Sequence, residues 1–226
     1  MTIDPTVLKF LSDLKANNNR EWFQANKKTY DGIRAEMNLF YQDIMQRLNQ
    51  HDEIEKLKMF RIYRDVRFSH DKTPYNPHFA GSFSRSGKRL RGGYYLRIRP
   101  GESFLAGGFW APNKEDLFRI RKEFELDDVE IREVLSNKEF RKHFGSELRG
   151  DEVKTAPKGF NKEHPAIDLI RKKGFVAVRE FTDSEVLNKN FVNQVDDAFK
   201  ALRPYFDYMS EVLTTDLNGV SLIEDN

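Results

Sequence analysis

The chain has 226 residues, 38% of them hydrophobic and 33% charged, with 38 Lys and Arg against 36 Asp and Glu for a formal net charge of +2. This length suits one domain with a substantial core, and we predict a single domain over residues 1–226. The lack of cysteine excludes disulfides and thiolate chemistry. No apolar run approaches the ~20 residues that cross a bilayer, and the start lacks the pattern of a signal peptide. We therefore expect a cytoplasmic protein without a membrane span.

Apolar residues at helical spacing predict two N-terminal helices. The first covers residues 5–15, where Pro5 suits the first turn. Three asparagines at positions 17–19 interrupt it, because asparagine favours turns and caps. The second is a long helix over residues 20–49, with Gly32 as a site for a bend or a break.

The middle of the chain predicts a largely antiparallel sheet, because strand follows strand without a helix between them. Pro100–Gly101 is expected to form a tight turn between the last two of these strands. Gly107 and Gly108 indicate a bulge or a close backbone approach. The predicted strands cover residues 57–68, 79–84, 93–100 and 103–110.

The second half predicts helices with one further strand at residues 175–181. Asn113 is the expected N-cap of the first of these helices. The predicted helices cover residues 113–124, 127–135, 138–144, 165–172 and 190–213, with a short one capped by Thr182 or Asp183. The fold class is therefore α+β: a largely antiparallel sheet backed by helices, with a basic sheet-rich part over about 54–111 and a helical part over about 112–213.

Positive charge is concentrated in one part of the chain. Between Lys58 and Arg99 there are eleven Lys or Arg against two acids, a net charge of +9, so the rest of the chain carries −7. Segments of this kind attract phosphates, carboxylates or nucleic acid through simple Coulomb attraction. The alternative is a structural role, in which these Lys and Arg side chains form ion pairs with acidic residues of the flanking helices.

Residues 61–75 hold the densest collection of reactive side chains. An arginine presents a planar fork that binds phosphate or carboxylate through two hydrogen bonds. We predict a site for a small anionic ligand, with or without acid–base catalysis. Its predicted binding residues are Arg61, Arg64, Arg67, Lys72 and, at the edge, Tyr75.

Four residues are candidates for acid–base catalysis. Flanking cations should lower the pKa of Asp65, which favours His70, Tyr75 and His78 for this role near neutral pH. A structural lattice of Arg–Asp ion pairs is the alternative for the same stretch. The histidine spacings match no recognised metal site, and we predict neither a metal nor a cofactor, since no phosphate-binding or dinucleotide-binding glycine motif occurs.

Two alternative functions remain open. A basic loop beside two tyrosines is typical of proteins that bind single-stranded nucleic acid; here the loop spans residues 85–91, next to Tyr94 and Tyr95. The acidic helical half would suit a structural or partner-binding protein, including one that pairs with a second copy of itself. The sequence leaves the oligomeric state open.

The stretch that begins at Arg61 resembles a family signature, RxxRDxRFxxxKxPYK. Its matching positions are Arg61, Arg64, Asp65, Arg67, Phe68, Lys72, Pro74 and Tyr75, whereas Asn76 stands where the signature has lysine. The family is the one known as domain of unknown function 2461, which is mainly bacterial with some fungal members. The resemblance extends over about residues 8–213. It implies a site but no reaction.

Overall fold

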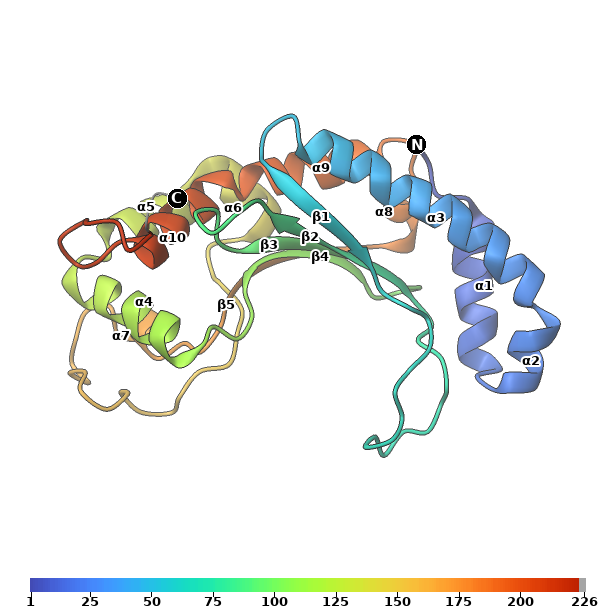
Figure 1. The fold of residues 1–226 in the computed structure, drawn as a ribbon, viewed down its shortest axis with the longest axis horizontal. Helices are drawn as coiled ribbons and strands as arrows, with labels where there is room; N and C mark the ends of the chain where they lie inside the picture. Colours follow the sequence, from blue (N-terminus) through green and yellow to red (C-terminus); the bar gives the residue numbers. More distant parts are fainter. Residues whose placement is uncertain (224–226) are drawn as a thin grey trace. The chain divides into compact units, whose positions relative to one another are not determined.

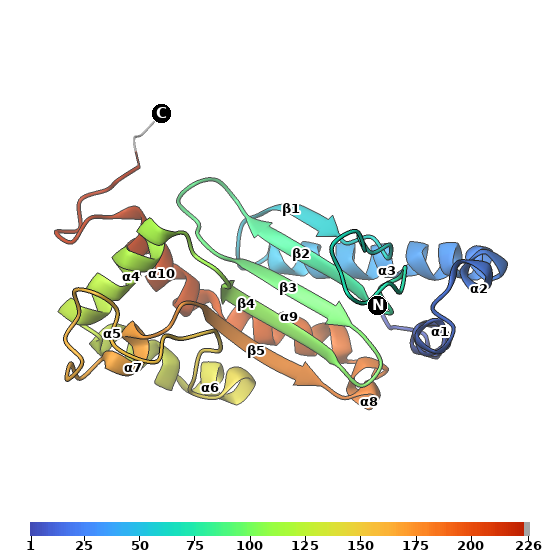
Figure 2. The ribbon, with the colours of Figure 1, turned by 90° about the horizontal axis from the view of Figure 1, so that it is seen from below.

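The computed structural model of the protein describes residues 1–223 and has the predicted α+β fold. Five strands form one antiparallel sheet whose spatial order follows the chain order (Figure 2). The predictions for the last four strands are confirmed to within two residues at each end. The strands are β1 (Ile54–Met59), β2 (Phe79–Arg85), β3 (Gly93–Ile98), β4 (Ser103–Phe109) and β5 (Phe175–Phe181).

The chain divides into two compact units, each built from segments that are far apart in the sequence. Unit 1 comprises Met1–Phe83, Tyr95–Leu105 and Glu180–Asp197. Unit 2 comprises Ser84–Tyr94, Ala106–Arg179 and the chain from Ala198 onward.

The N-terminal helices of unit 1 are α1 (Pro5–Ala16), α2 (Arg20–Ala25) and α3 (Lys27–Leu48) (Figure 1). The prediction of one helix over residues 20–49 is wrong, because the chain breaks at Asn26. The backbone and side-chain amides of Asn26 both donate to the Trp22 carbonyl, at 3.1 and 2.9 Å, which closes α2. Gly32, the expected break, lies within α3.

The core of unit 1 lies between α3 and the sheet. The buried Tyr41 hydroxyl donates to the carbonyls of Phe79 at 3.3 Å and Leu96 at 3.1 Å. This pairing satisfies a polar group that would otherwise be costly to bury. Phe40 stacks on Phe191 of α9 (Phe191–Ala201), with ring centroids 6.0 Å apart. In Figure 2, α3 lies behind the sheet and the strands lie in front.

The strand predicted over residues 57–68 is shorter than expected, since β1 ends at Met59. Residues 60–78 form a loop that projects from the sheet in Figure 1. A continued strand would have placed Arg64 on the apolar face, and Pro74 and Pro77 lack the N–H groups that a paired strand needs. One isolated antiparallel bridge, between Tyr63 and Tyr75, joins the two arms of this loop.

Unit 2 holds most of the predicted helices. Asn113 caps the first of them as expected, since its side chain accepts a hydrogen bond from the Asp116 N–H at 2.8 Å. The helix predicted over residues 190–213 is interrupted at Leu202, and Pro204 lies in the first turn of the helix that follows. The remaining helices are α4 (Lys114–Leu126), α5 (Val129–Ser136), α6 (Lys138–Phe144), α7 (Ile167–Ile170), α8 (Asp183–Val186, in unit 1) and α10 (Arg203–Thr214).

The core of unit 2 is aromatic. The buried Tyr205 hydroxyl donates to the Phe175 carbonyl at 2.8 Å, and Tyr94 packs edge-on against Phe206 with ring centroids 4.9 Å apart. Gly108 has φ +138°, and a Cβ there would lie 2.2 Å from the Phe175 carbonyl oxygen. The close backbone approach predicted for this glycine is therefore confirmed.

Candidate functional site

The loop that carries the family-like stretch is fixed at its base by backbone and side-chain hydrogen bonds. The Arg64 N–H donates to the Pro74 carbonyl at 2.9 Å, and the Asn76 N–H donates to the Ile62 carbonyl at 2.7 Å. The Tyr75 ring is buried and stacks on Phe23 of α2, with centroids 4.1 Å apart. The base of the loop is thus held against the N-terminal helices.

A hollow of about 420 Å³ opens beside the base of this loop in unit 1, and we call it the His78 hollow. It draws residues from three separate parts of the chain: the end of α1 with the residues that follow it, the loop itself, and the turn after β3. Its lining residues are Lys15, Asn18, Arg64, Asp71, Thr73, Tyr75, Asn76, Pro77, His78 and Arg99.

Arg64 is held by polar groups of its own loop. Its Nη1 donates to the Asp71 carboxylate and, at 2.5 Å, to the Thr73 hydroxyl, while Nη2 donates to Ser69 Oγ at 3.4 Å. The Thr73 N–H donates to Asp71 at 2.9 Å. This backbone bond and the Arg64 pair lower the pKa of Asp71 to about 2, so its carboxylate is charged at neutral pH.

Arg99 reaches the hollow from the other side. Its guanidinium lies 3.3 Å from the Glu102 carboxylate, and a quarter of its side chain is exposed. Its Nε is buried and has no hydrogen-bond partner among residues 1–223. The guanidinium therefore keeps donor capacity beyond its ion pair.

His78 lies where the loop meets β2. Burial, followed by the charges of Arg97 and Arg99, lowers the pKa of His78 to about 4, while Glu102 opposes the shift. The imidazole is therefore neutral at pH 7. Its Nδ1 is buried and has no hydrogen-bond partner in the described part of the chain. His78 thus lines the hollow with a neutral ring whose buried Nδ1 is unsatisfied.

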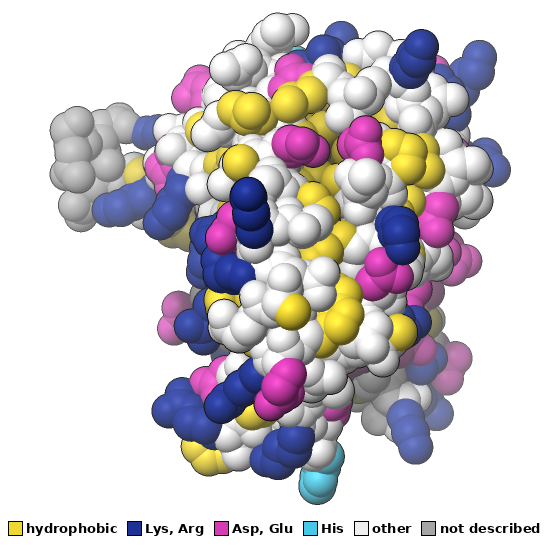
Figure 3. All heavy atoms as spheres, turned by 90° about the vertical axis from the view of Figure 1, so that its right-hand side faces the viewer, with side chains coloured by type: hydrophobic (Ala, Val, Ile, Leu, Met, Phe, Trp, Pro, Cys, Tyr) yellow, Lys and Arg dark blue, Asp and Glu magenta, His cyan; other side chains and the backbone are white. Residues whose placement is uncertain are grey.

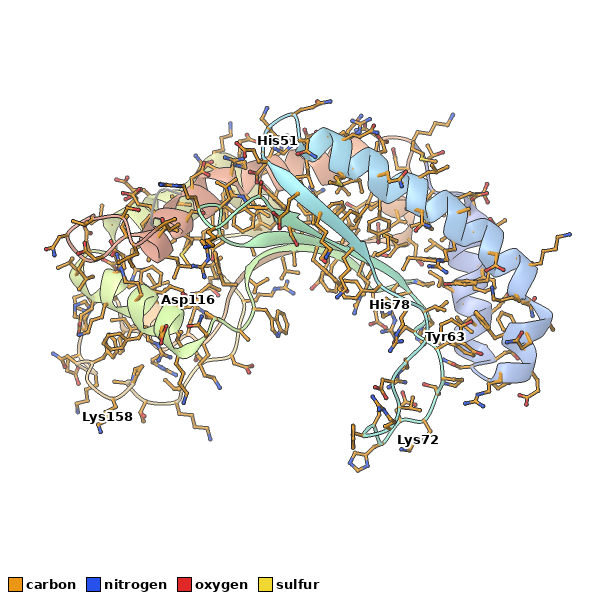
Figure 4. All side chains as sticks on the ribbon, viewed as in Figure 1. His51, Tyr63, Lys72, His78, Asp116 and Lys158 are labelled. Carbon is orange, nitrogen blue, oxygen red and sulfur yellow. The ribbon has the colours of Figure 1, made fainter. Side chains whose placement is uncertain are left out.

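Three of the predicted binding residues lie outside this lining. Arg67 pairs with Asp65 at 2.7 Å, and 77% of its side chain is exposed. Lys72 donates to the Val66 carbonyl at 3.1 Å, and Arg61 is exposed. In Figure 4, Lys72 lies toward the tip of the loop, away from His78. Arg64 and Tyr75 are the two predicted binding residues that line the hollow.

The four acid–base candidates also separate. His78 and Tyr75 line the hollow, whereas Asp65 and His70 are exposed elsewhere on the loop. Hydrogen bonds from Arg67 lower the pKa of Asp65, and burial raises the pKa of Tyr75. Both shifts move these two groups away from the range in which a side chain exchanges protons near neutral pH.

Sequence reasoning missed Lys15, Asn18 and Arg99. Asn18 belongs to the asparagine run that indicates a break after the first helix, and its side chain forms hydrogen bonds with the Tyr75 backbone. Arg99 belongs to the basic segment but lies 35 residues after Arg64. Charge clustering singled out the segment that contains Arg99, whereas the fold brings Lys15, Asn18 and Arg99 to one hollow.

The basic loop at residues 85–91 is largely built into unit 2. The Arg85 side chain is fully buried and donates to the Arg91 carbonyl at 2.9 Å and to Ser210 Oγ at 3.2 Å. The Arg91 guanidinium pairs with Asp116 at 2.6 Å. Lys88 is exposed. Arg85 and Arg91, at the two ends of the loop, therefore contribute to packing, whereas Lys88 and Arg89 between them are exposed.

Charges elsewhere are mixed. Figure 3 faces the end of unit 1 that carries α1 and α2, and it shows Lys and Arg side chains interspersed with Asp and Glu. Within residues 1–223, the structure brings no three His, Asp or Glu side chains together as a candidate metal site. None of the described helices is both long and apolar enough to cross a membrane.

Comparisons with known proteins give one match. No curated protein and no solved structure is significantly similar to the chain. A family model described as "Conserved hypothetical protein (DUF2461)" matches residues 6–208 and so covers the His78 hollow and most of both units. The chain belongs to the DUF2461 family of conserved hypothetical proteins.

Proposed function

We propose that unit 1 binds a small anionic ligand, with a phosphate or carboxylate group in the His78 hollow. The observation that carries this proposal is the convergence of Lys15, Arg64 and Arg99 on one hollow that has a single lining carboxylate, Asp71. Asp71 is already bonded to Arg64 and Thr73. An anion would add hydrogen bonds to these cations, and charge-assisted hydrogen bonds are roughly twice as strong as neutral ones.

His78 gives the hollow a proton acceptor. Its imidazole is neutral at pH 7, and the nearby positive charges are part of the reason. A bound anion would offset those charges and raise the pKa of His78, so that the ring could take up a proton from the ligand. Any acid–base step in this hollow would therefore use His78 in preference to Asp65 or His70.

Titration with inorganic phosphate tests the proposal. Two-dimensional NMR of the imidazole nitrogens should show the pKa of His78 rising as phosphate is added, and the signals of the exposed His70 serve as the control. The melting temperature should rise in the same titration, because a ligand that binds only the folded state stabilises it. An unmoved His78 signal at saturating phosphate would contradict the proposal.

The hollow is favoured over the other candidate surface. A nucleic-acid site on the loop at residues 85–91 would need its arginines at the surface, whereas Arg85 is buried and Arg91 is paired with Asp116, which leaves Arg89 exposed. A purely structural role for the loop that begins at Arg61 would leave the buried Nδ1 of His78 unexplained.

A further inference from the structure

Three aromatic rings form a row in unit 1, which we call the aromatic row: Phe60, Tyr95 and Phe104. The ring centroids of Phe60 and Tyr95 are 6.1 Å apart, and those of Tyr95 and Phe104 are 5.5 Å apart. The rings come from the residue that follows β1, from β3 and from β4, so the row crosses the direction of the strands.

The alternation of the strands explains where this row lies. Leu96 and Ile98 of β3 are fully buried, whereas Tyr95 and Arg97, which alternate with them, are partly exposed. Tyr95 therefore lies on the sheet face opposite Leu96, whose carbonyl accepts a hydrogen bond from Tyr41 of α3. On that face β2 presents the small side chains Ala80 and Ser82, which lets rings from β1 and β3 meet across it.

Positive charge lies at both ends of the aromatic row. The Lys58 ammonium is 5.4 Å from the Phe60 ring centroid, and the Arg97 guanidinium is 4.4 Å from that of Phe104. The Glu102 carboxylate is 3.6 Å from Arg97 and 3.3 Å from Arg99. Because Arg99 lines the His78 hollow, a continuous set of contacts links the row to the hollow.

The Phe104 end of the row also opens into space. Arg97 and Phe104 line a second hollow of about 660 Å³, together with four acidic residues: Glu102, Glu180, Asp183 and Glu185. Carboxylates repel a phosphate, but they accept hydrogen bonds from the amino groups of a nucleobase. This second hollow therefore suits a base, while the cations of the His78 hollow suit a phosphate.

We infer that unit 1 binds single-stranded nucleic acid, with a phosphate in the His78 hollow and bases against the aromatic row. This inference rests on the proposed function and names what carries the phosphate. Bases stack on aromatic side chains exposed on a sheet, and cations along the same face attract the phosphodiester backbone. The aromatic row has Lys58 at one end and Arg97 and Arg99 at the other. This arrangement suits a nucleic-acid segment of several nucleotides.

Fluorescence anisotropy with a fluorescein-labelled oligodeoxycytidylate of about eight nucleotides, within the site size of single-strand binding folds, tests the inference, because cytosine carries an amino group. Phe60→Ala should weaken binding by about fivefold or more, the low end of the contribution of one stacked base. Phe118→Ala is the matched control, because Phe118 is 55% exposed, against 44% for Phe60, and lies in unit 2. Phe60→Leu keeps the apolar bulk without the aromatic face and should lose the same affinity. Circular dichroism melting checks that all three variants are folded.

The outcomes separate the inference from the proposed function. Inorganic phosphate should compete with the oligonucleotide, and raising the salt concentration should weaken binding steeply, because several phosphate contacts release counterions. Phosphate that shifts His78 without any oligonucleotide binding would overturn the inference alone. The inference alone would also be overturned if the Phe60→Ala and Phe60→Leu variants bound the oligonucleotide as tightly as Phe118→Ala does. Failure of phosphate to shift His78 would overturn both.

Discussion

Asn18 and Tyr75 exchange two hydrogen bonds, although they lie 57 residues apart in the sequence. Asn18 Nδ2 donates to the Tyr75 carbonyl at 2.9 Å, and the Tyr75 N–H donates to Asn18 Oδ1 at 3.1 Å. The Asn18 side-chain amide thus pairs with both the N–H and the carbonyl of Tyr75, as the backbone of a neighbouring β-strand would. This pair ties the loop at residues 60–78 to the end of α1 and thereby gives the His78 hollow two of its walls.

Replacement of Asn18 by Ala should loosen this connection. The variant leaves a partly buried N–H and carbonyl of Tyr75 without these partners, so the free energy of unfolding should fall by about 1–3 kcal/mol. Affinity for inorganic phosphate should fall as well, because the walls of the hollow lose their alignment. Urea denaturation and a phosphate titration measure the two effects.

Asn17→Ala is the matched control for this substitution. Asn17 is exposed, and its side chain donates to the carbonyl of Asp13 in the preceding helix α1, at 2.9 Å. Its loss should change the free energy of unfolding by no more than about 0.5 kcal/mol. Equal effects of the two substitutions would show that the Asn18 pair does not hold the loop.

His78 should make the stability depend on pH in the acid range. Burial and the charges of Arg97 and Arg99 lower its pKa in the folded protein from 6.5 to about 4. Between these values the unfolded chain binds a proton that the folded chain does not, so stability should rise with pH from about 4 to about 6.5. His78→Gln should remove about 2 kcal/mol of this dependence, once solvent screening is allowed for.

Urea denaturation of wild type and His78→Gln at several pH values between these limits measures the difference. His70→Gln is the control, because His70 is an exposed histidine of the same loop. Parallel stability curves for wild type and His78→Gln would contradict a lowered pKa at this position.

Arg85 should be needed for stability. Its fully buried guanidinium is bonded to the Arg91 carbonyl and to Ser210, and lies 3.3 Å from Asp207. Arg85→Met should lower the free energy of unfolding by about 3–5 kcal/mol, because it leaves these groups without their buried donor. Lys88→Met, on the exposed part of the same loop, should change it by about 0.5 kcal/mol or less. Equal stability of the two variants in guanidinium denaturation would show that the loop is not a packing element.

The sheet could be predicted from the sequence because its signals are local. The alternation of apolar and polar residues, together with turn residues, predicted the ends of β2, β3 and β4 to within two residues, and both ends of β5 were predicted without error. The segment after Met59 also alternates, and there the same rule failed. Hydrogen bonds to distant residues such as Asn18 give these residues a loop conformation, and no local pattern carries that information.

The candidate site could be predicted only in part for a related reason. The family-like stretch correctly identified a region rich in cations, but Arg67 pairs with its own neighbour Asp65. Lys15 and Arg99 join Arg64 because α1 and the turn after β3 meet the base of the loop. The choice among the arginines of this stretch therefore depends on tertiary structure, which charge spacing does not encode.

The most direct test of the His78 hollow compares four Arg→Gln variants, at positions 61, 64, 67 and 99, by the dissociation constant for inorganic phosphate. Each substitution removes one positive charge, so a general electrostatic effect would weaken all four alike. The account predicts a loss of about tenfold or more for Arg64→Gln and Arg99→Gln, the value of a charged hydrogen bond, and little change for the other two. Equal losses in all four variants, or the largest loss in Arg67→Gln, would contradict it.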